Sequence, residues 1–263
     1  GNFLKFLDPK KYEQYLLERY KGSAPSTPKP KFDFKPTKFE QTDYFEKLIK
    51  ISELDDKHPA KQVVIKRKIP TDYLDKLYLC NKFMSFVNEV KPNTFPHTKG
   101  EHPRLIIPFY GVDGKPFAFQ GRAFGKEQPK YITIKFDDTK QKIYGIDRLD
   151  LNKPVMITEG PIDSLFLDNA IALAGADADI KINHEQCTMI FDNEPRNQEI
   201  VNRMIKAVDK KFNLVVWPKS LKYKDINDMI IAGKTSTEIE TIISNNTYCG
   251  LTALQHINNW KGI

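Results

Sequence analysis

The sequence predicts an α/β protein (α+β overall) whose mainly parallel sheet, flanked by helices, follows a smaller basic region of helices and antiparallel strands. From Lys153 onward, apolar runs alternate with helical segments, which is typical of a parallel sheet. Residues 104–146 instead hold strands around an Asp113-Gly114 turn, which is typical of an antiparallel hairpin. Residues 1–150 hold 29 basic and 20 acidic residues, and residues 151–263 hold 12 and 14. The first region therefore suits a polyanion such as nucleic acid, or is a lysine-rich solvated surface, and the second suits a cation.

The overall composition excludes several classes of protein. The chain has 263 residues, 40% hydrophobic and 29% charged, with 41 Lys plus Arg against 34 Asp plus Glu. This length supports one large domain or two small ones with a real core. No apolar run approaches the roughly 20 residues that span a bilayer, and the N-terminus lacks the features of a secretion signal. Gly1 in place of an initiator Met predicts a processed or truncated chain.

The cysteines predict neither a disulfide framework nor a zinc site. Cys80, Cys187 and Cys249 are scattered, and no Cys-x-x-Cys pair occurs. We therefore expect no zinc in this chain and a reducing, cytoplasmic setting.

The N-terminal half predicts helices before strands. Residues 8–20 suit a short helix, and four prolines make residues 22–37 an extended tether. Residues 39–95 are expected to be mainly helical, with helix starts at Pro59 and Thr71. We divide the chain into residues 1–38 (helix and tether), 39–150 (basic subdomain), 151–235 (parallel-sheet domain) and 236–263 (helical C-terminal segment).

The remaining elements follow from the period of the apolar residues. The expected strands are 105–110, 117–119 and 131–134 in the first region, then 155–158, 171–173, 188–191 and 214–217 in the second. Helices are expected over 161–169 and 198–208.

Acidic residues follow three strands of the second region. Glu159, Asp192 and Asp225 recur at equal intervals of 33 residues, with Glu194 and Asp228 close by. Carboxylates at the carboxyl ends of neighbouring parallel strands converge, and they repel one another unless a cation neutralises them. Oxygen ligands suit Mg²⁺ or Mn²⁺, ions that serve phosphoryl transfer. The alternative is that these residues cap helices and line loops.

These motifs together resemble a known family. Glu159-Gly160-Pro161-Ile162-Asp163, Asp192-x-Glu194 and Lys224-Asp225-Ile226-Asn227-Asp228 are similar to the acidic motifs of a Toprim domain. Upstream, Arg104-Leu105-Ile106-Ile107-Pro108, Phe119-Gln120-Gly121-Arg122, Pro129-Lys130-Tyr131 and Lys142-Ile143-Tyr144-Gly145 resemble the catalytic core of bacterial and phage primases. The resemblance covers about residues 55–235 and is nearest to DnaG-type primases of tailed bacteriophages.

The resemblance implies a role for each matching acidic residue. Glu159 matches a metal ligand or general base, and Asp192 and Glu194 match an Asp-x-Asp metal pair in which Glu194 is one methylene longer. Asp225 matches the third acidic motif, whose next acidic position is occupied here by Asn227, with Asp228 just beyond. We expect Asp225 and Asp228 as further metal ligands. We expect Glu159, Asp192 and Glu194 to be catalytic.

Other matching residues are expected to bind substrate or support the site. Arg104, Arg122, Lys130 and Lys142 match positions that hold nucleotide phosphates or template. The supporting residues are Asp163, Gly160, Asn227 and Arg196.

The resemblance implies a DNA primase core that makes short RNA primers on single-stranded DNA from ribonucleoside triphosphates with two Mg²⁺ or Mn²⁺ ions. It also implies a replicative helicase and a zinc-binding module as partners, and a bacterial host cytoplasm if the protein is phage-encoded. No phosphate-binding loop of a helicase motor occurs in this chain. Two alternatives remain open: a metal-dependent Toprim nuclease and a catalytically degenerate nucleic-acid-binding subunit.

Overall fold

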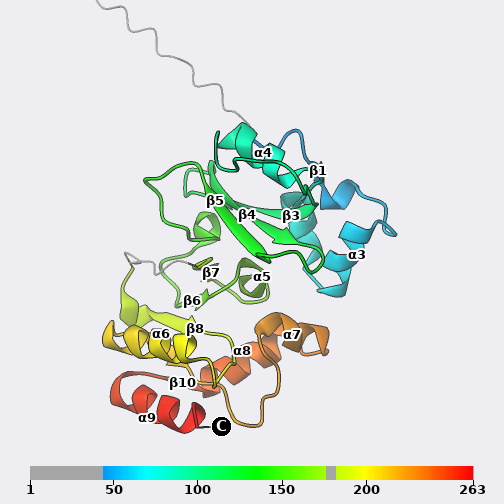
Figure 1. The fold of residues 1–263 in the computed structure, drawn as a ribbon. Coiled ribbons are helices and arrows are strands. Elements are labelled where there is room, and N and C mark those ends of the chain that lie inside the picture. Colours follow the sequence, from blue (N-terminus) through cyan, green and yellow to red (C-terminus); the bar gives the residue numbers. More distant parts are fainter. Residues whose placement is uncertain (1–43, 176–181, 263) are drawn as a thin grey trace, which may run out of the picture. The chain divides into compact units, whose positions relative to one another are not determined.

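Two five-stranded sheets carry the described part of the chain (Figure 1). The computed structural model describes residues 44–175 and 182–262, so the predicted N-terminal helix and tether lie outside it. The first sheet is antiparallel throughout, in the order β1 (Ile49–Lys50), β2 (Tyr78–Cys80), β3 (Arg104–Tyr110), β4 (Pro116–Ala123), β5 (Tyr131–Lys135). The second has the order β10 (Thr247–Tyr248), β9 (Asn213–Val215), β8 (Cys187–Ile190), β6 (Val155–Thr158), β7 (Ala170–Ala172), and all its pairs are parallel except β10 with β9. The predicted fold class is confirmed.

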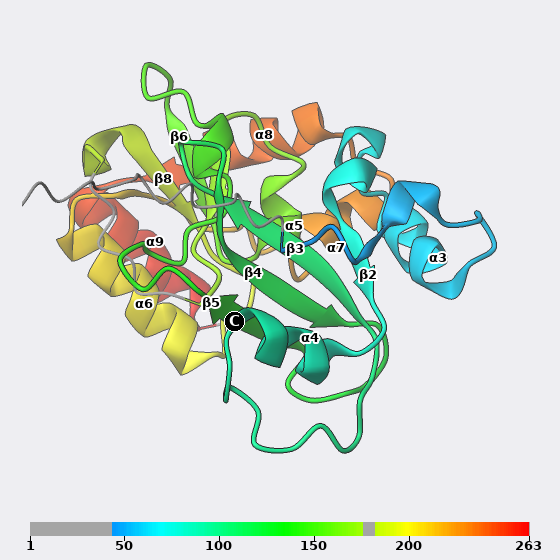
Figure 2. The same cartoon turned by 90° about the horizontal axis from the view of Figure 1, so that it is seen from above.

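The first sheet has one face against a helix and one toward the second sheet. The β3–β4 hairpin turns at the predicted position, where Gly114 has a φ of +70° that a glycine adopts without steric cost. On one face, Phe119 packs with Phe83 and Phe86 of α4 (Phe83–Val90), which lies along this sheet (Figure 2). Because side chains alternate along a strand, Gln120 points to the opposite face.

The structure differs from the helical prediction for residues 39–95. Helix α3 (Pro59–Lys66) begins at the predicted proline, and Thr71–Lys76 forms a 3₁₀ helix, η2. Residues 44–48 form turns, followed by β1 and the short 3₁₀ helix η1 (Ile51–Glu53). The helical spacing around Tyr44 was misleading, because its apolar neighbours serve the aromatic cluster around Phe45. All three residues of β2 are buried, so no alternation marked that strand.

Helices cover both faces of the second sheet. Helices α6 (Gln198–Asp209) and α9 (Gly250–Trp260) pack on one face, around Val155, Ile157 and Leu214. The other face packs against α5 (Pro161–Ser164), α7 (Ile226–Ile231) and α8 (Ser236–Asn245). Helix α5 is shorter than the predicted 161–169, because the chain turns after Ser164 to enter β7.

One hydrophobic cluster joins the two sheets. It contains Ile107 and Phe109 from β3, Ala172 from β7, Ile190 from β8 and Met229 from α7. The first sheet therefore rests on the same apolar layer that covers one face of the second. The division of the chain at residue 150 stays a prediction.

The C-terminal segment contains α8 and α9, as expected, and one strand that was not predicted. Helix α8 starts with a capping box in which Thr235 and Glu238 bond to each other's backbone N–H. β10 pairs Thr247 with Val215 at the edge of the sheet. Two residues are too few to show a strand period. Within residues 44–175 and 182–262, no helix has both the length and the apolar character that a membrane crossing requires.

Candidate active site

The acidic strand ends line one cleft of about 470 Å³. Glu159 follows β6, Asp192 and Glu194 follow β8, and Asp225 is the N-cap of α7 after β9. Asp163 and Gly160 of the α5 turn border the same cleft. The opposite wall comes from strands β4 and β5 and the residue before β5: Gln120, Lys130, Tyr131 and Thr133. The structure therefore brings an acidic edge of one sheet to face a polar and basic surface of the other.

Both oxygens of the Glu159 carboxylate are held by this chain. The backbone N–H of Asp192 donates to Oε2 at 2.9 Å, and Arg203 of α6 forms an ion pair with Oε1. The guanidinium of Arg203 lies over the ring of Phe191, 5.2 Å from its centroid. These contacts fix the direction in which the Glu159 carboxylate points.

A second basic residue, Lys224, neutralises the Asp192-x-Glu194 pair. Its Nζ lies 2.6 Å from Oε1 of Glu194 and 3.8 Å from Oδ2 of Asp192. The hydrogen bond lowers the pKa of Glu194 and raises that of Lys224. The amide of Asn197 donates to the other Glu194 oxygen at 2.8 Å. The extra methylene of Glu194 thus places its carboxylate between a lysine and an amide.

Three neighbouring carboxyl groups resist ionisation. Burial, followed by the charge of Asp225, raises the pKa of Asp163 to about 8. Burial, followed by the charge of Glu159, raises the pKa of Asp192 to about 7, and burial also raises the pKa of Asp225. The backbone N–H of Asn227 donates to Asp163 at 2.9 Å, which opposes the effect on Asp163. Positive charge close to these groups would lower their pKa values and favour their ionised forms.

The donor atoms suit a hard divalent cation in kind, but they form no closed cage. The oxygens of Glu159, Asp192 and Asp225 are the ligand type that Mg²⁺ and Mn²⁺ prefer. Across residues 44–175 and 182–262, no three His, Cys, Asp or Glu side chains stand close enough together to enclose an ion.

The three polar side chains of the third acidic motif, Asp225, Asn227 and Asp228, make different contacts. Asp225 caps α7 by accepting the N–H of Asp228 at 2.7 Å. Asp228 itself is exposed and does not line the cleft. Asn227 is buried and turns away to Arg67 at the end of α3, accepting from Nη1 at 2.5 Å and donating to the Arg67 carbonyl at 2.7 Å. Asn227 is thus placed as a link between the two sheets' helices.

Of the four basic candidates, Lys130 and Arg122 lie on the wall formed by β4 and β5. Lys130 lines the cleft directly. Arg122 is buried, with Nε donating to the hydroxyl of Tyr131 at 3.3 Å and Nη1 to the carbonyl of Ala123 at 3.0 Å. Burial, followed by the nearby charge of Arg122, lowers the pKa of Arg67.

The other basic candidates lie elsewhere. Arg104 is fully buried, and its guanidinium donates to the carbonyls of Gly121, Pro129 and Lys130. We therefore leave Arg104 out of the nucleotide-binding set and give it a structural role. Lys142 does not line the cleft, and Arg196 lies on the exposed loop that contains Glu194 and Asn197.

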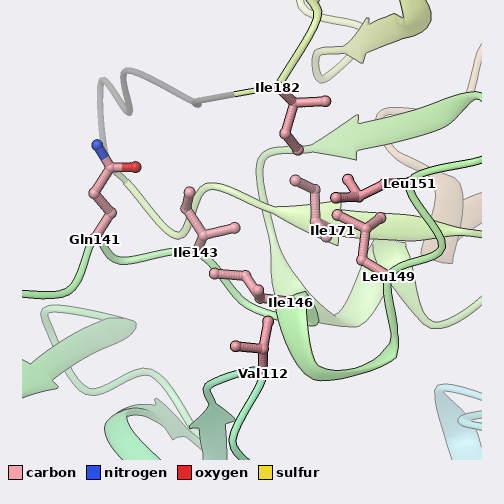
Figure 3. Close-up of a pocket in the computed structure, with 8 residues that line it drawn as sticks. All are labelled: Val112, Gln141, Ile143, Ile146, Leu149, Leu151, Ile171 and Ile182. Carbon is pink, nitrogen blue, oxygen red and sulfur yellow. The ribbon is translucent and has the colours of Figure 1, made fainter.

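A second cavity, of about 260 Å³, has a different character (Figure 3). Its lining residues among those described are mainly aliphatic, with Gln141 as the polar one: Val112, Gln141, Ile143, Ile146, Leu149, Leu151, Ile171 and Ile182.

Sequence reasoning missed Arg67, Arg203 and Gln120 as cleft or near-cleft residues, and it did not assign Lys224 a role. Lys224 stands directly before Asp225, so its position was a usable signal. Arg203 falls in the first half of the helix that follows the Asp192 loop, which was a weaker one. Arg67 is 160 residues from its partner Asn227, so no local pattern indicated that contact.

Comparison with known proteins decides the family. No protein-family model matches the chain. The chain is 36% identical to the DNA primase of Enterobacteria phage T4 over 270 residues, which is 100% of this chain and 78% of that protein. This chain belongs to the DNA primases. The primase is also 28% identical to the DNA primase of Thermotoga maritima over 145 residues, 48% of this chain and 26% of that one.

Solved structures agree on the fold. The primase matches the zinc-binding and RNA polymerase domains of the Aquifex aeolicus primase with a TM-score of 0.52 and 16% identity, over 73% of this chain and 57% of that one. It matches the RNA polymerase domain of Mycobacterium tuberculosis DnaG with a TM-score of 0.52 and 16% identity, over 74% and 79%. A DnaG catalytic domain bound to single-stranded DNA matches with a TM-score of 0.51 and 14% identity, over 75% and 74%. These structures confirm the predicted fold. The identity to the phage T4 protein confirms the predicted family, the DNA primases, which are DNA-directed RNA polymerases.

Proposed function

We propose that this primase copies single-stranded DNA into short RNA primers at the cleft between its two sheets, using ribonucleoside triphosphates and two Mg²⁺ or Mn²⁺ ions. The observation that carries the proposal is the pairing of walls: carboxylates at the ends of β6 and β8 face Lys130 and the β4–β5 surface. A nucleoside triphosphate needs metal ions near its reacting phosphate and basic side chains on the rest of its charge, and this cleft offers both.

The acidic wall holds the metal ions in this proposal. Glu159, Asp192 and Asp225 supply oxygen ligands, with Glu194 released from Lys224 as a fourth. The ions would neutralise charge at the phosphate and align the attacking and leaving oxygens. Arg203 and the Asp192 N–H keep the Glu159 carboxylate in its orientation, so the protein spends little free energy on arranging it when substrate arrives.

The opposite wall receives the nucleotide and the template. Lys130 is exposed beside Tyr131, where it can contact a phosphate without leaving a buried site. Arg122 lies beside Tyr131, and its charge acts on Arg67, so both guanidinium groups add positive charge near this wall. We extend the proposal to the primase's surroundings: a replicative helicase and a zinc-binding module as partners, in the cytoplasm of a bacterial host.

Primer synthesis is tested with single-stranded DNA, labelled ribonucleotides and Mg²⁺ or Mn²⁺, with products resolved by length. Glu159→Gln removes one charge from the cleft and should abolish synthesis. Glu53→Gln makes the same change at an exposed position in η1 and should leave synthesis intact. The proposal is supported if the unmodified protein and Glu53→Gln make short RNA and Glu159→Gln makes none.

Other products would contradict it. Shortened DNA would favour a nuclease. If no RNA forms even when a zinc-binding module and a helicase are supplied, the chain is a degenerate DNA-binding subunit instead.

A further inference from the structure

One buried polar atom on the nucleotide-facing wall has no partner among the residues that the structure describes. Gln120 lies on β4 opposite Thr133 of β5, and its Nε2 donates to the Thr133 hydroxyl at 3.2 Å. The side chain is 4% exposed, and Oε1 accepts no hydrogen bond. Among the described residues, it is the one buried side-chain oxygen or nitrogen in this condition. A buried acceptor without a donor destabilises a protein, so its retention calls for a compensating use.

The position of Gln120 indicates what the missing partner is. Gln120, Thr133 and Tyr131 line the same cleft as Glu159 and Asp163. The nearby Arg122 does not supply the donor, because its guanidinium donates to the Tyr131 hydroxyl and the Ala123 carbonyl. Since Gln120 borders the cleft, a molecule bound there can donate the missing hydrogen bond to Oε1.

The functional groups of a nucleotide differ in whether they can donate a hydrogen bond to Gln120 Oε1. Ionised phosphates carry acceptors only, so in the observed orientation, with Nε2 bonded to Thr133, the amide oxygen of Gln120 does not favour the triphosphate. Base amino groups are donors, but they sit at different positions on the four bases that a copying enzyme must accept. The ribose hydroxyl is common to all four. A hydroxyl both donates and accepts, so it also fits the amide after the half-turn that exchanges Oε1 and Nε2.

We propose that Gln120, supported by Thr133, binds a ribose hydroxyl of the incoming nucleotide and so favours ribonucleotides over deoxyribonucleotides. The inference rests on the proposed function, since it requires a nucleotide in this cleft. The 2′-hydroxyl is the group that only the ribonucleotide has. A site built to hydrogen-bond a hydroxyl discriminates against the analogue that lacks it, because the buried amide is then left unpaired.

Nucleotide binding tests the proposal without requiring synthesis. Calorimetry with Mg²⁺ gives Kd for ATP, 2′-deoxyATP and 3′-deoxyATP on the unmodified primase, on Gln120→Met and on Gln62→Met. The second variant makes the same change in α3, where the Gln62 amide bonds to the Asp56 carbonyl away from the cleft. Gln120→Met should weaken ATP binding roughly three- to tenfold and leave Kd for the deoxyribonucleotide that lacks the contacted hydroxyl unchanged. Gln62→Met should alter none of the three.

The deoxynucleotides separate the two hydroxyls, and a thermal scan excludes unfolding. If Gln120→Met leaves Kd for 2′-deoxyATP unchanged, the contact is to the 2′-hydroxyl. If it leaves Kd for 3′-deoxyATP unchanged instead, the contact is to the 3′-hydroxyl, and the proposed selection of ribonucleotides is overturned. Gln120→Met should change Tm little, because removal of the unpartnered buried acceptor offsets the lost hydrogen bond to Thr133. The inference is overturned if Gln120→Met weakens binding of all three nucleotides equally or weakens none. It is also overturned if the unmodified protein binds ribo- and deoxyribonucleotides with the same Kd or binds neither. Failure of primer synthesis with selective binding intact would instead count against the proposed function.

Discussion

Arg104 is the residue for which structure and sequence resemblance suggest different roles, and one substitution separates them. Its side chain is fully buried and lies over the Phe83 ring, 5.1 Å from the centroid. It donates to the carbonyls of Pro129 at 2.8 Å, Gly121 at 3.0 Å and Lys130 at 3.3 Å. Arg104 therefore ties β4 to the segment that presents Lys130 to the cleft.

Arg104→Met keeps most of the apolar stem and removes these donors. Each hydrogen bond contributes about 1 kcal/mol net, and a carbonyl left buried without a donor adds to the loss. Three such bonds predict a decrease of about 3–5 kcal/mol in the free energy of unfolding. In a chain of this size, that corresponds to a fall in Tm on the order of 10 °C.

Urea denaturation and a thermal scan measure both quantities, with Lys126→Met as the matched control. Lys126 is exposed in the loop between β4 and β5, so its loss removes the same charge without breaking a buried bond. We expect its unfolding free energy to change by less than about 0.5 kcal/mol. If Arg104→Met were as stable as Lys126→Met and instead lost affinity for DNA, the structural role would be refuted and the template-binding role restored.

Three further perturbations test other parts of the site. Asn227→Ala breaks both hydrogen bonds to Arg67 and should lower the free energy of unfolding, measured in urea, by about 2–4 kcal/mol. The control Asn259→Ala, at an exposed position, should change it little. Equal effects of the two substitutions would contradict a stabilising contact between Asn227 and Arg67. The folded-state pKa values of about 8 for Asp163 and about 7 for Asp192 lie above those of the unfolded chain, so their stabilising contribution is complete below about pH 4 and is lost as the pH rises through 7 and 8. In chelator, the stability of the unmodified primase should therefore fall by a few kcal/mol between pH 4 and 8 relative to Asp163→Asn, and parallel curves would refute this. Arg203→Gln should slow primer synthesis about tenfold with little change in Tm, and Lys206→Gln on the exposed side of α6 should not; a matching loss in both would remove the positioning role of Arg203.

The acidic wall could be predicted because its signals are local. Glu159 and Asp192 stand directly after short apolar strands, and strands of a parallel sheet end at a common edge. The strand pattern alone thus indicates that these carboxylates lie together. The shortest elements gave no such signal: β1, β2 and β10 have two or three residues, too few for a period.

The contacts that complete the site could not be predicted, because they join distant parts of the chain. Arg203 is 44 residues from Glu159, and Arg67 is 160 residues from Asn227. Arg104 shows a related limit. An arginine in a resembling motif looks the same whether its guanidinium faces a phosphate or three backbone carbonyls, and only the packing of the β3–β5 segment shows which.

The apolar layer shared by the two sheets has a consequence for how such a protein can be rearranged in evolution or in the laboratory. Ile107 and Phe109 of β3 cover the same layer as Ala172 and Ile190 of the second sheet. A fragment starting after residue 150 would present that face to water and be prone to aggregate. The second sheet with its acidic edge therefore cannot be moved into another protein by itself. The transfer must include strands β3–β5, or polar side chains must replace the apolar residues of the sheet face that β3 covers.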